Sequence, residues 1–281
     1  MHIEKYLESI SSFKNKKVLL TGATSGIGKE LFFHLVKKEA DIILFAYEMD
    51  IANELKNRYP DRNIDIIYYD QSSFKKIEES IDILLDKYSV VDYFVFNAGV
   101  LALKGKTVDG YATTIGINYL GVKHFIEYIS PKISFCTRFI IQGSFASIFH
   151  LKKNIDFKDE SLSTFDQYNA SKIYLEAYFY YLYINNKYPN ISYVLTEPGL
   201  TNTNIISNFN KVIRFLGKHF LKIFCHSPIK ASLTLLKAMD KDVNNGDFIT
   251  PRGLFALGGY PKIKRFPKKR RKEYLFKKED N

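Results

Sequence analysis

The sequence has few of the residues that mark unusual classes of protein. Its 281 residues include only 15 glycines and eight prolines, which excludes collagen-like and low-complexity architectures. No stretch approaches the roughly 18 consecutive apolar residues that a membrane-spanning helix needs. The two cysteines, Cys136 and Cys225, lie far apart and lack the spacing of a zinc site, so no metal is expected. With 46% hydrophobic and 25% charged residues, the chain is typical of an ordinary globular protein.

The first ten residues also lack the features of a secretion signal. They carry His2, Glu4, Lys5 and Glu8, which interrupt any apolar core. A secreted chain of this size would often contain more cysteines. A cytoplasmic location is therefore expected.

The net charge of +11 is concentrated at one end of the chain. Residues 261–281 hold ten basic and three acidic residues, so this segment alone contributes +7. Such a segment is most often a solvated tail, and attraction to anionic lipid is the alternative that would make the protein peripherally membrane-associated. Nothing else in the sequence favours nucleic acid, so no nucleic-acid partner is predicted.

Short apolar runs alternate with longer segments of helical period, which is the pattern of βαβ units. The pattern predicts an α/β fold with a doubly wound, seven-stranded parallel sheet in one domain over residues 17–260, after an N-terminal extension (1–16) and before the basic tail (261–281). Ligands of such sheets bind beyond the carboxyl ends of the strands. The predicted strands are Lys17–Thr21, Asp41–Ala46, Asn63–Tyr68, Val91–Asn97, Arg138–Gly143, Ile191–Thr196 and Asp247–Thr250.

A glycine-rich turn follows the first predicted strand. Gly22, Gly26 and Gly28 lie in the sequence TGATSGIG, and a helix is predicted to begin within it. Glycine lets the backbone approach a pyrophosphate closely, and the free N–H groups at the start of a helix attract its charge. A phosphate-loop NTPase is excluded, because the required glycine before Gly105-Lys106-Thr107 is Val100. The turn therefore predicts dinucleotide binding.

Three motifs in order resemble the short-chain dehydrogenase/reductase family: Thr21–Gly28, Asn97-Ala98-Gly99 and Tyr168–Lys172. Residues 106–111, 116–121 and 259–261 resemble its retinol-dehydrogenase-like branch. The resemblance covers about residues 17 to 262. It implies a Rossmann domain, an NAD(P) cofactor and oxidoreductase activity.

Tyr168 and Lys172 are four residues apart in a predicted helix, so both side chains emerge on one face. A nearby ammonium favours the phenolate form of a tyrosine, and Lys172 is therefore expected to lower the pKa of Tyr168. The resemblance implies that Ser144 orients the substrate carbonyl, with Ser147 as the alternative hydroxyl. It further implies that Tyr168 is the general acid, that Lys172 also binds the ribose, and that Asn118 holds a relay water.

The resemblance also implies a set of cofactor-binding residues along the carboxyl edge of the sheet. Asp70 matches a position that contacts adenine, but it could equally cap a helix. Thr203 matches a threonine beside the nicotinamide carboxamide, but it could be an ordinary loop hydroxyl. The full predicted set is Gly22, Thr24, Ser25, Gly26, Ile27, Gly28, Tyr47, Asp70, Asn97, Ala98, Gly99, Tyr168, Lys172, Pro198, Gly199, Thr201 and Thr203.

The choice between NAD(H) and NADP(H) depends on the end of the second strand, where an acid binds the ribose 2′-hydroxyl or a base binds a 2′-phosphate. Ala46 stands where NAD enzymes of this family carry the acid, and Tyr47 stands where NADP enzymes carry arginine. Because the acid is missing at Ala46, NADP(H) is favoured over NAD(H). Thr24 and Ser25 are the candidate partners of the phosphate.

Residues about 201–226 are predicted to form a substrate lid. Within them, residues 211–225 form a basic amphipathic helix, which either covers the pocket or docks on an anionic membrane together with the tail. The predicted substrate is a small apolar carbonyl compound or alcohol. Residues 173–183 are apolar nearly all round, which predicts a homodimer unless the chain extensions cover that helix.

The predicted function is that of an NAD(P)(H)-dependent oxidoreductase interconverting an apolar ketone or aldehyde and its alcohol. A dinucleotide-binding sensor or scaffold with little turnover is the alternative, but Ser144, Tyr168 and Lys172 are all present. The glycine spacing argues against a nucleotide-sugar epimerase on a related fold.

Overall fold

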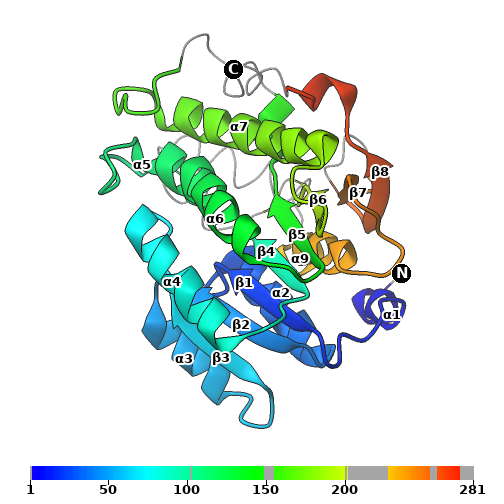
Figure 1. Cartoon of the computed structure of the whole chain (residues 1–281). Coiled ribbons are helices and arrows are strands. Elements are labelled where there is room, and N and C mark those ends of the chain that lie inside the picture. The colour runs from blue at the N-terminus through cyan, green and yellow to red at the C-terminus, as the bar shows by residue number, and fades with distance from the viewer. Residues whose placement is uncertain are drawn as a thin grey trace.

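The computed structural model describes residues 2–101, 103–148, 155–199, 201, 227–253 and 258–272. Its centre is an eight-stranded sheet of order β3-β2-β1-β4-β5-β6-β7-β8 (Figure 1). Every neighbouring pair is parallel except β7 with β8. The strands are β1 (Lys17–Thr21), β2 (Asp41–Ala46), β3 (Ile64–Tyr68), β4 (Tyr93–Phe96), β5 (Thr137–Gln142), β6 (Ile191–Thr196), β7 (Asp247–Pro251) and β8 (Pro261–Arg265).

Helices cover both faces of this sheet (Figure 1). The α-helices are α1 (Ile3–Glu8), α2 (Gly26–Lys37), α3 (Met49–Asn57), α4 (Phe74–Lys87), α5 (Thr113–Ile115), α6 (Val122–Ile129), α7 (Thr164–Asn185) and α9 (Pro228–Ala238). Side chains alternate between the faces along each strand: Leu19 packs with α4, α6 and α7, whereas Val18 and Leu20 pack with α1, α2, α3 and α9. A π-helical segment, η1 (Gly116–Gly121), joins α5 to α6, and the 3₁₀ turns are η2 (Ser130–Lys132), η3 (Phe145–Ile148) and η6 (Lys268–Arg270).

The predicted α/β doubly wound class is confirmed, and all seven predicted strands are present. The strand count was too low by one, because β8 pairs antiparallel with β7. This strand lies beyond residue 260, where the basic tail was predicted to begin. Backbone hydrogen bonds form a strand whatever its side-chain charge, and lysines are common on exposed edge strands. The high charge of residues 261–281 predicted a solvated tail, and the edge strand within it was therefore not predicted.

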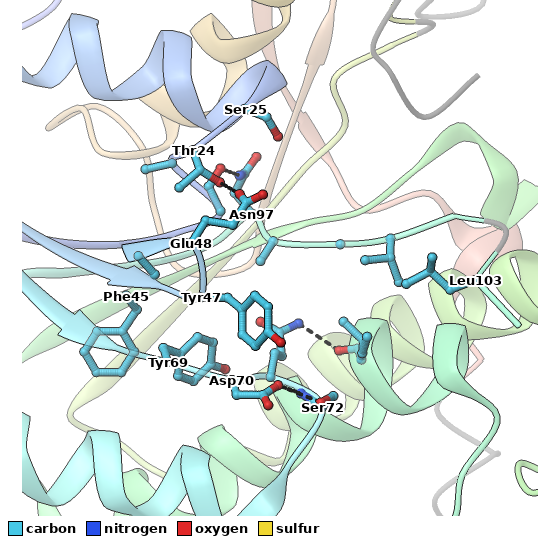
Figure 2. A pocket seen from close by; sticks show the side chains of 18 of the residues that line it. Thr24, Ser25, Phe45, Tyr47, Glu48, Tyr69, Asp70, Ser72, Asn97 and Leu103 are labelled. Carbon is cyan, nitrogen blue, oxygen red and sulfur yellow. Dashed lines mark hydrogen bonds between the residues drawn. The ribbon is translucent and has the colours of Figure 1, made fainter. Parts of the chain in front are cut away.

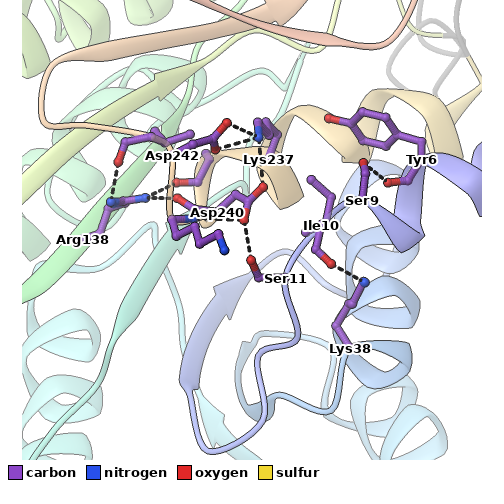
Figure 3. A network of polar contacts seen from close by, with 12 residues as sticks. Tyr6, Ser9, Ile10, Ser11, Lys38, Arg138, Lys237, Asp240 and Asp242 are labelled. Atoms are coloured by element: carbon purple, nitrogen blue, oxygen red, sulfur yellow. Dashed lines mark hydrogen bonds and ion pairs between the residues drawn. The ribbon is translucent and has the colours of Figure 1, made fainter.

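The N-terminal extension packs against the domain. Tyr6 and Leu7 of α1 are buried in the same cluster as α2 and α9. Ser11 donates a hydrogen bond to Asp240 at 2.9 Å, and Asp240 also pairs with Lys237 at 2.9 Å (Figure 3). Arg138 donates to carbonyl oxygens at the end of α9 and in the turn that follows it. These contacts join the extension to the sheet.

One side of the long helix α7 is buried within a single chain. Ile173, Ala177 and Phe179 are each at most 2% exposed, whereas Tyr180 and Tyr183 are partly exposed. The homodimer therefore stays a prediction. None of the described helices is both long and apolar enough to cross a bilayer.

Candidate active site

The glycine-rich turn after β1 is built around close backbone contacts. Gly22 has a φ of +70° and Gly26 a φ of +53°, a region that side-chain-bearing residues rarely adopt. A Cβ atom at Gly22 would lie 2.8 Å from the Cα atom of Ala98, and one at Gly28 would overlap the Gly22 carbonyl. Glycine is required at both positions because the backbone fills the space where a side chain would stand.

The predicted Asn97-Ala98-Gly99 motif is bonded to this turn. The side chain of Thr21 accepts hydrogen bonds from the backbone N–H groups of Asn97 (3.1 Å) and Ala98 (3.0 Å). The Asn97 amide donates to the carbonyl oxygens of Thr21 and Gly22 at 3.0 and 3.1 Å. The ends of β1 and β4 therefore form one rigid rim.

A hollow of about 610 Å³ opens above this rim (Figure 2). Its size and its glycine-rich wall suit a dinucleotide, since the backbone N–H groups at the start of α2 can approach a phosphate closely. Of the predicted cofactor residues, Gly28 packs behind the wall. Those that line the hollow are Gly22, Thr24, Ser25, Gly26, Ile27, Tyr47, Asp70, Asn97, Ala98 and Gly99.

Asp70 lies in this hollow and does not cap a helix. One of its oxygens accepts hydrogen bonds from the Ser72 backbone (2.9 Å) and the Ser72 hydroxyl (2.6 Å). The cap of α4 is Ser73, whose hydroxyl accepts from the Lys76 N–H. The helix-cap alternative for Asp70 is therefore wrong, and its contact with adenine stays a prediction.

Glu48 is a site residue that the sequence analysis did not select. Its carboxylate accepts a hydrogen bond of 2.5 Å from the Thr24 hydroxyl, which places it over the glycine-rich turn (Figure 2). Glu48 lines the hollow beside Ala46 and Tyr47. A carboxylate thus lies in the hollow two positions after Ala46, directly before α3.

The predicted catalytic residues meet at the ends of β5 and α7. The Tyr168 hydroxyl donates a 3.2 Å hydrogen bond to the Ser144 hydroxyl. Lys172, one helical turn further along α7, donates to the Gln142 carbonyl at 3.0 Å. Its ammonium lies 5.9 Å from the centre of the Tyr168 ring. Ser147 is buried on η3, so Ser144 is the serine bonded to the tyrosine.

Asn118 joins the rim to the helix that bears the tyrosine. Its side chain accepts from the Val100 N–H (2.7 Å) and donates to the Val100 carbonyl (2.8 Å). It also donates to the Ser171 hydroxyl at 3.3 Å. Asn118 lies in the π-helical segment, a distortion that is frequent at functional sites. Its role in holding a water stays a prediction.

Burial sets the protonation of the tyrosine and lysine. It raises the pKa of Tyr168 above its usual value, and the hydrogen bond with Ser144 offsets this in part. It lowers the pKa of Lys172 to about 8. The expected lowering of the tyrosine's pKa is therefore wrong for this structure, because desolvation outweighs the distant ammonium.

Three further predicted cofactor residues follow β6. Gly199 has a φ of +77°, and the Thr201 hydroxyl lies 3.5 Å from the carbonyl oxygens of Pro198 and Gly199. Thr203, most of the predicted lid (201–226) and the last part of the tail (273–281) lie outside the described residues.

Two buried acids and one arginine around the catalytic residues were also missed. Glu176 lies one turn beyond Lys172 on α7, and Glu197 follows β6 directly. Arg270 reaches both of them from η6. The spacing of Tyr168, Lys172 and Glu176 at every fourth residue was the available signal for Glu176. Nothing in the sequence pointed to Arg270.

Comparison with known proteins shows the family of this chain. The family model of the short chain dehydrogenases matches residues 16–213, so the chain belongs to that family. It is 28% identical to human retinol dehydrogenase 13 over 178 residues, which are 60% of this chain and 52% of that protein. This similarity confirms the predicted resemblance to the retinol-dehydrogenase-like branch. The chain spans about half the length of this curated relative.

Solved structures share the fold. A protein from Mycobacterium Paratuberculosis superposes with a TM-score of 0.73 at 19% identity, covering 96% of this chain and 92% of that one. A complex of Pseudomonas aeruginosa RhlG with NADP superposes with a TM-score of 0.64 at 19% identity, covering 86% of this chain and 93% of that one. A short chain dehydrogenase from Burkholderia phymatum in complex with NAD superposes with a TM-score of 0.61 at 17% identity, covering 81% of this chain and 86% of that one. The fold thus occurs with either dinucleotide.

Proposed function

We propose that this protein is an NAD(P)(H)-dependent oxidoreductase that interconverts a small apolar ketone or aldehyde and its alcohol, with Tyr168 as general acid and base. The observation that carries the proposal is the contact between the Tyr168 and Ser144 hydroxyls, with Lys172 one turn away on the same helix. Membership of the short chain dehydrogenase family supports the reaction class.

The protonation of these groups suits the reducing direction. When bound, a reduced nicotinamide supplies the hydride that adds to the carbonyl carbon. Ser144 holds the carbonyl oxygen, and Tyr168 gives its proton to that oxygen as charge develops there. Because burial raises the pKa of Tyr168, the phenol keeps its proton at neutral pH. Alcohol oxidation needs the phenolate, so we expect it to gain relative to reduction as pH rises.

The position of Glu48 argues for NAD(H), against the NADP(H) preference drawn from Ala46. Its carboxylate, bonded to Thr24, lies in the hollow beside Ala46, where the ribose 2′ position is expected. A carboxylate can accept a hydrogen bond from a 2′-hydroxyl, but it repels a 2′-phosphate. We therefore expect NADH to bind at least about tenfold more tightly than NADPH, a difference of about 1.4 kcal/mol.

Calorimetric titration with NADH and NADPH, followed by nicotinamide absorbance with apolar ketones and aldehydes, tests the function. Tyr168→Phe should lower turnover by about a thousandfold and leave dinucleotide affinity within about twofold. Equal turnover by Tyr168→Phe and the wild-type protein would contradict the mechanism. Binding without turnover of any carbonyl would favour the sensor or scaffold alternative.

A second variant tests the dinucleotide preference. Glu48→Gln removes the negative charge and keeps a group that can bond to Thr24, so it should narrow the difference between NADH and NADPH. Glu54→Gln, on the neighbouring helix α3, is the control for a general change in surface charge. Tighter binding of NADPH than of NADH by the wild-type protein would instead support the preference inferred from Ala46.

A further inference from the structure

Four ionisable side chains lie buried behind the Tyr168 and Ser144 hydroxyls. Lys172, Glu176, Glu197 and Arg270 are 5%, 1%, 1% and 9% exposed, respectively. We call these four residues the buried charge cluster. Charges are rarely buried unless they are paired, and here two carboxylates face one arginine and one lysine.

Arg270 lies between the two carboxylates. One nitrogen of its guanidinium group is 2.5 Å from a Glu197 oxygen and 3.6 Å from a Glu176 oxygen. The guanidinium also lies over the ring of Phe248, 5.5 Å from the ring centre. Arg270 comes from η6, a segment that contacts both α7 and η3.

Glu176 connects this arginine to the catalytic serine. Its other oxygen accepts a 3.1 Å hydrogen bond from the backbone N–H of Ser144. A Cβ atom at Gly143 would lie only 2.5 Å from that oxygen, so the carboxylate packs directly against the serine-bearing turn. The position of Ser144 therefore depends on where the Glu176 carboxylate is held.

Glu197 connects the same arginine to the other side of the site. It follows β6, and its backbone N–H donates to the Ile249 carbonyl at 2.8 Å. The next residue is Pro198, which begins the loop that the family resemblance assigns to the nicotinamide. A single guanidinium thus contacts one carboxylate that is bonded to the Ser144 turn and another that directly follows β6.

We propose that Arg270 is a positioning residue, which holds the carboxylates of Glu176 and Glu197 and so fixes the Ser144 turn relative to the loop that begins at Pro198. The inference rests on the proposed function, because it assigns these turns to one active site. Arg270 lies beyond residues 16–213, the part of the chain that matches the family model. The basic C-terminal segment is thereby a working part of the site.

The proposal has an electrostatic consequence for Lys172. Burial raises the pKa of Glu176 to about 7. Arg270, the Ser147 hydroxyl and the Ser144 N–H lower this pKa, and Glu197 raises it. The charge of Glu176 in turn raises the pKa values of Lys172, Tyr168 and Lys272.

Without Arg270, the Glu176 carboxylate would take up a proton at higher pH than it does in the wild-type protein. Lys172 would then lose its negative neighbour and release its own proton more easily. Removal of a guanidinium from η6 should therefore lower the pKa of a lysine on α7.

Spectra of protein carrying ¹³C-labelled lysine measure this directly, with the Lys172 signal assigned from its absence in Lys172→Met. In Arg270→Gln, we expect the Lys172 titration to move to lower pH by about one unit. Arg270→Lys, which keeps the positive charge, should restore part of the shift. The matched control is Arg271→Gln, because Arg271 donates to the Phe266 carbonyl and contacts neither carboxylate.

Turnover gives a second readout. The alkaline fall in carbonyl reduction should move with the Lys172 titration in Arg270→Gln and stay in place in Arg271→Gln. An unchanged Lys172 titration in Arg270→Gln, or an equal shift in both variants, would overturn the proposal. A wild-type protein without turnover would refute the proposed function alone, since the lysine spectra need no substrate.

Loss of Arg270 leaves two buried carboxylates facing a single cation, so Arg270→Gln can fail to fold. In that case the double variant Glu197→Gln/Arg270→Gln is titrated, because it removes one negative charge together with the positive one. The Lys172 titration is again expected to move to lower pH in the double variant. An unchanged titration there would also overturn the proposal.

Discussion

The two halves of the sheet contribute different kinds of residues and contacts to the site. Around β1, β2 and β4, the hollow is lined by the glycine-rich turn and the Asn97 amide, and its charged lining residues, Glu48, Asp70 and Lys106, are not buried. Around β5 and β6, the site depends on four buried ionisable side chains. The first half holds its shape through close backbone contacts, and the second through paired charges.

This difference separates binding from chemistry. A wall of glycine and backbone N–H groups can approach phosphates without titrating, so its geometry is expected to be insensitive to pH. Buried charged groups shift one another's pKa values, and general acid–base catalysis depends on such shifts. Changes to the first half should therefore alter affinity, and changes to the second should alter turnover and pH dependence.

The largest expected effect is on turnover in the second half. Lys172→Met replaces the buried ammonium with an apolar group of similar length and should lower turnover by about a thousandfold. The free energy of unfolding should also fall, because the Gln142 carbonyl loses its hydrogen bond and the two buried carboxylates keep only one cation. Lys76→Met, at an exposed ion pair on α4, is the control and should leave turnover unchanged. Steady-state rates and thermal unfolding measure both effects. A fall in dinucleotide affinity with no fall in turnover would contradict the division into a binding half and a catalytic half.

The next largest effect is on the glycine wall. Gly28→Ala places a methyl group against the Gly22 carbonyl and the Asn97 amide, so part of the rim must move. We expect a loss of about 2 kcal/mol in the free energy of unfolding and at least a tenfold loss in NADH affinity. Denaturant unfolding and calorimetry would measure these. Unchanged affinity would mean that the rim does not contact the cofactor.

Glu176 predicts how stability depends on pH. Because its pKa is raised from 4.5 to about 7, the native state holds a proton that the unfolded chain releases between these values. Its contribution to stability is thus fully present below pH 4.5 and is lost as pH rises through about 7. In Glu176→Gln, the free energy of unfolding measured with denaturant should fall by about 1 to 3 kcal/mol less over this pH range than in the wild-type protein. An identical slope in wild-type and variant proteins would show that Glu176 is already ionised at low pH.

The smallest effect compares two helix caps. Ser163 caps α7 by accepting from the Asp166 N–H, and Ser73 caps α4 by accepting from the Lys76 N–H. Replacing either with alanine should cost about 1 kcal/mol of unfolding free energy. Only Ser163→Ala should also lower turnover, because α7 carries Tyr168 close to its start. Equal turnover in the two variants would indicate that the first turn of α7 does not position the tyrosine.

The elements that could be predicted from the sequence are those whose signals are local. The strands β1, β2 and β6 have the predicted bounds, since apolar runs of strand length are bordered by turns. The glycine-rich turn and the four-residue spacing of Tyr168 and Lys172 also lie within short segments. The strand β8 was not predicted, because it pairs with β7 through backbone hydrogen bonds and its basic side chains form no apolar run of strand length.

The long-range pairings of the site could not be predicted from local patterns. Glu48 reaches Thr24 across 24 positions of sequence, and Arg270 reaches Glu197 across 73. The pKa of Tyr168 depends on how deeply the folded chain buries it, and spacing alone predicted the opposite direction. Burial and long-range pairing are properties of the packed molecule.

The sequence by itself determined the doubly wound fold and the glycine turn, because periodicity and short-range spacing encode them. The tyrosine, serine and lysine were selected through the family resemblance of the motifs. The tertiary structure decided which acid lies in the hollow beside Ala46, which charges lie buried near Lys172, and that Arg270 pairs with Glu176 and Glu197. Electrostatic effects depend on distance and solvent exposure, and only the folded chain fixes these for residues far apart in sequence.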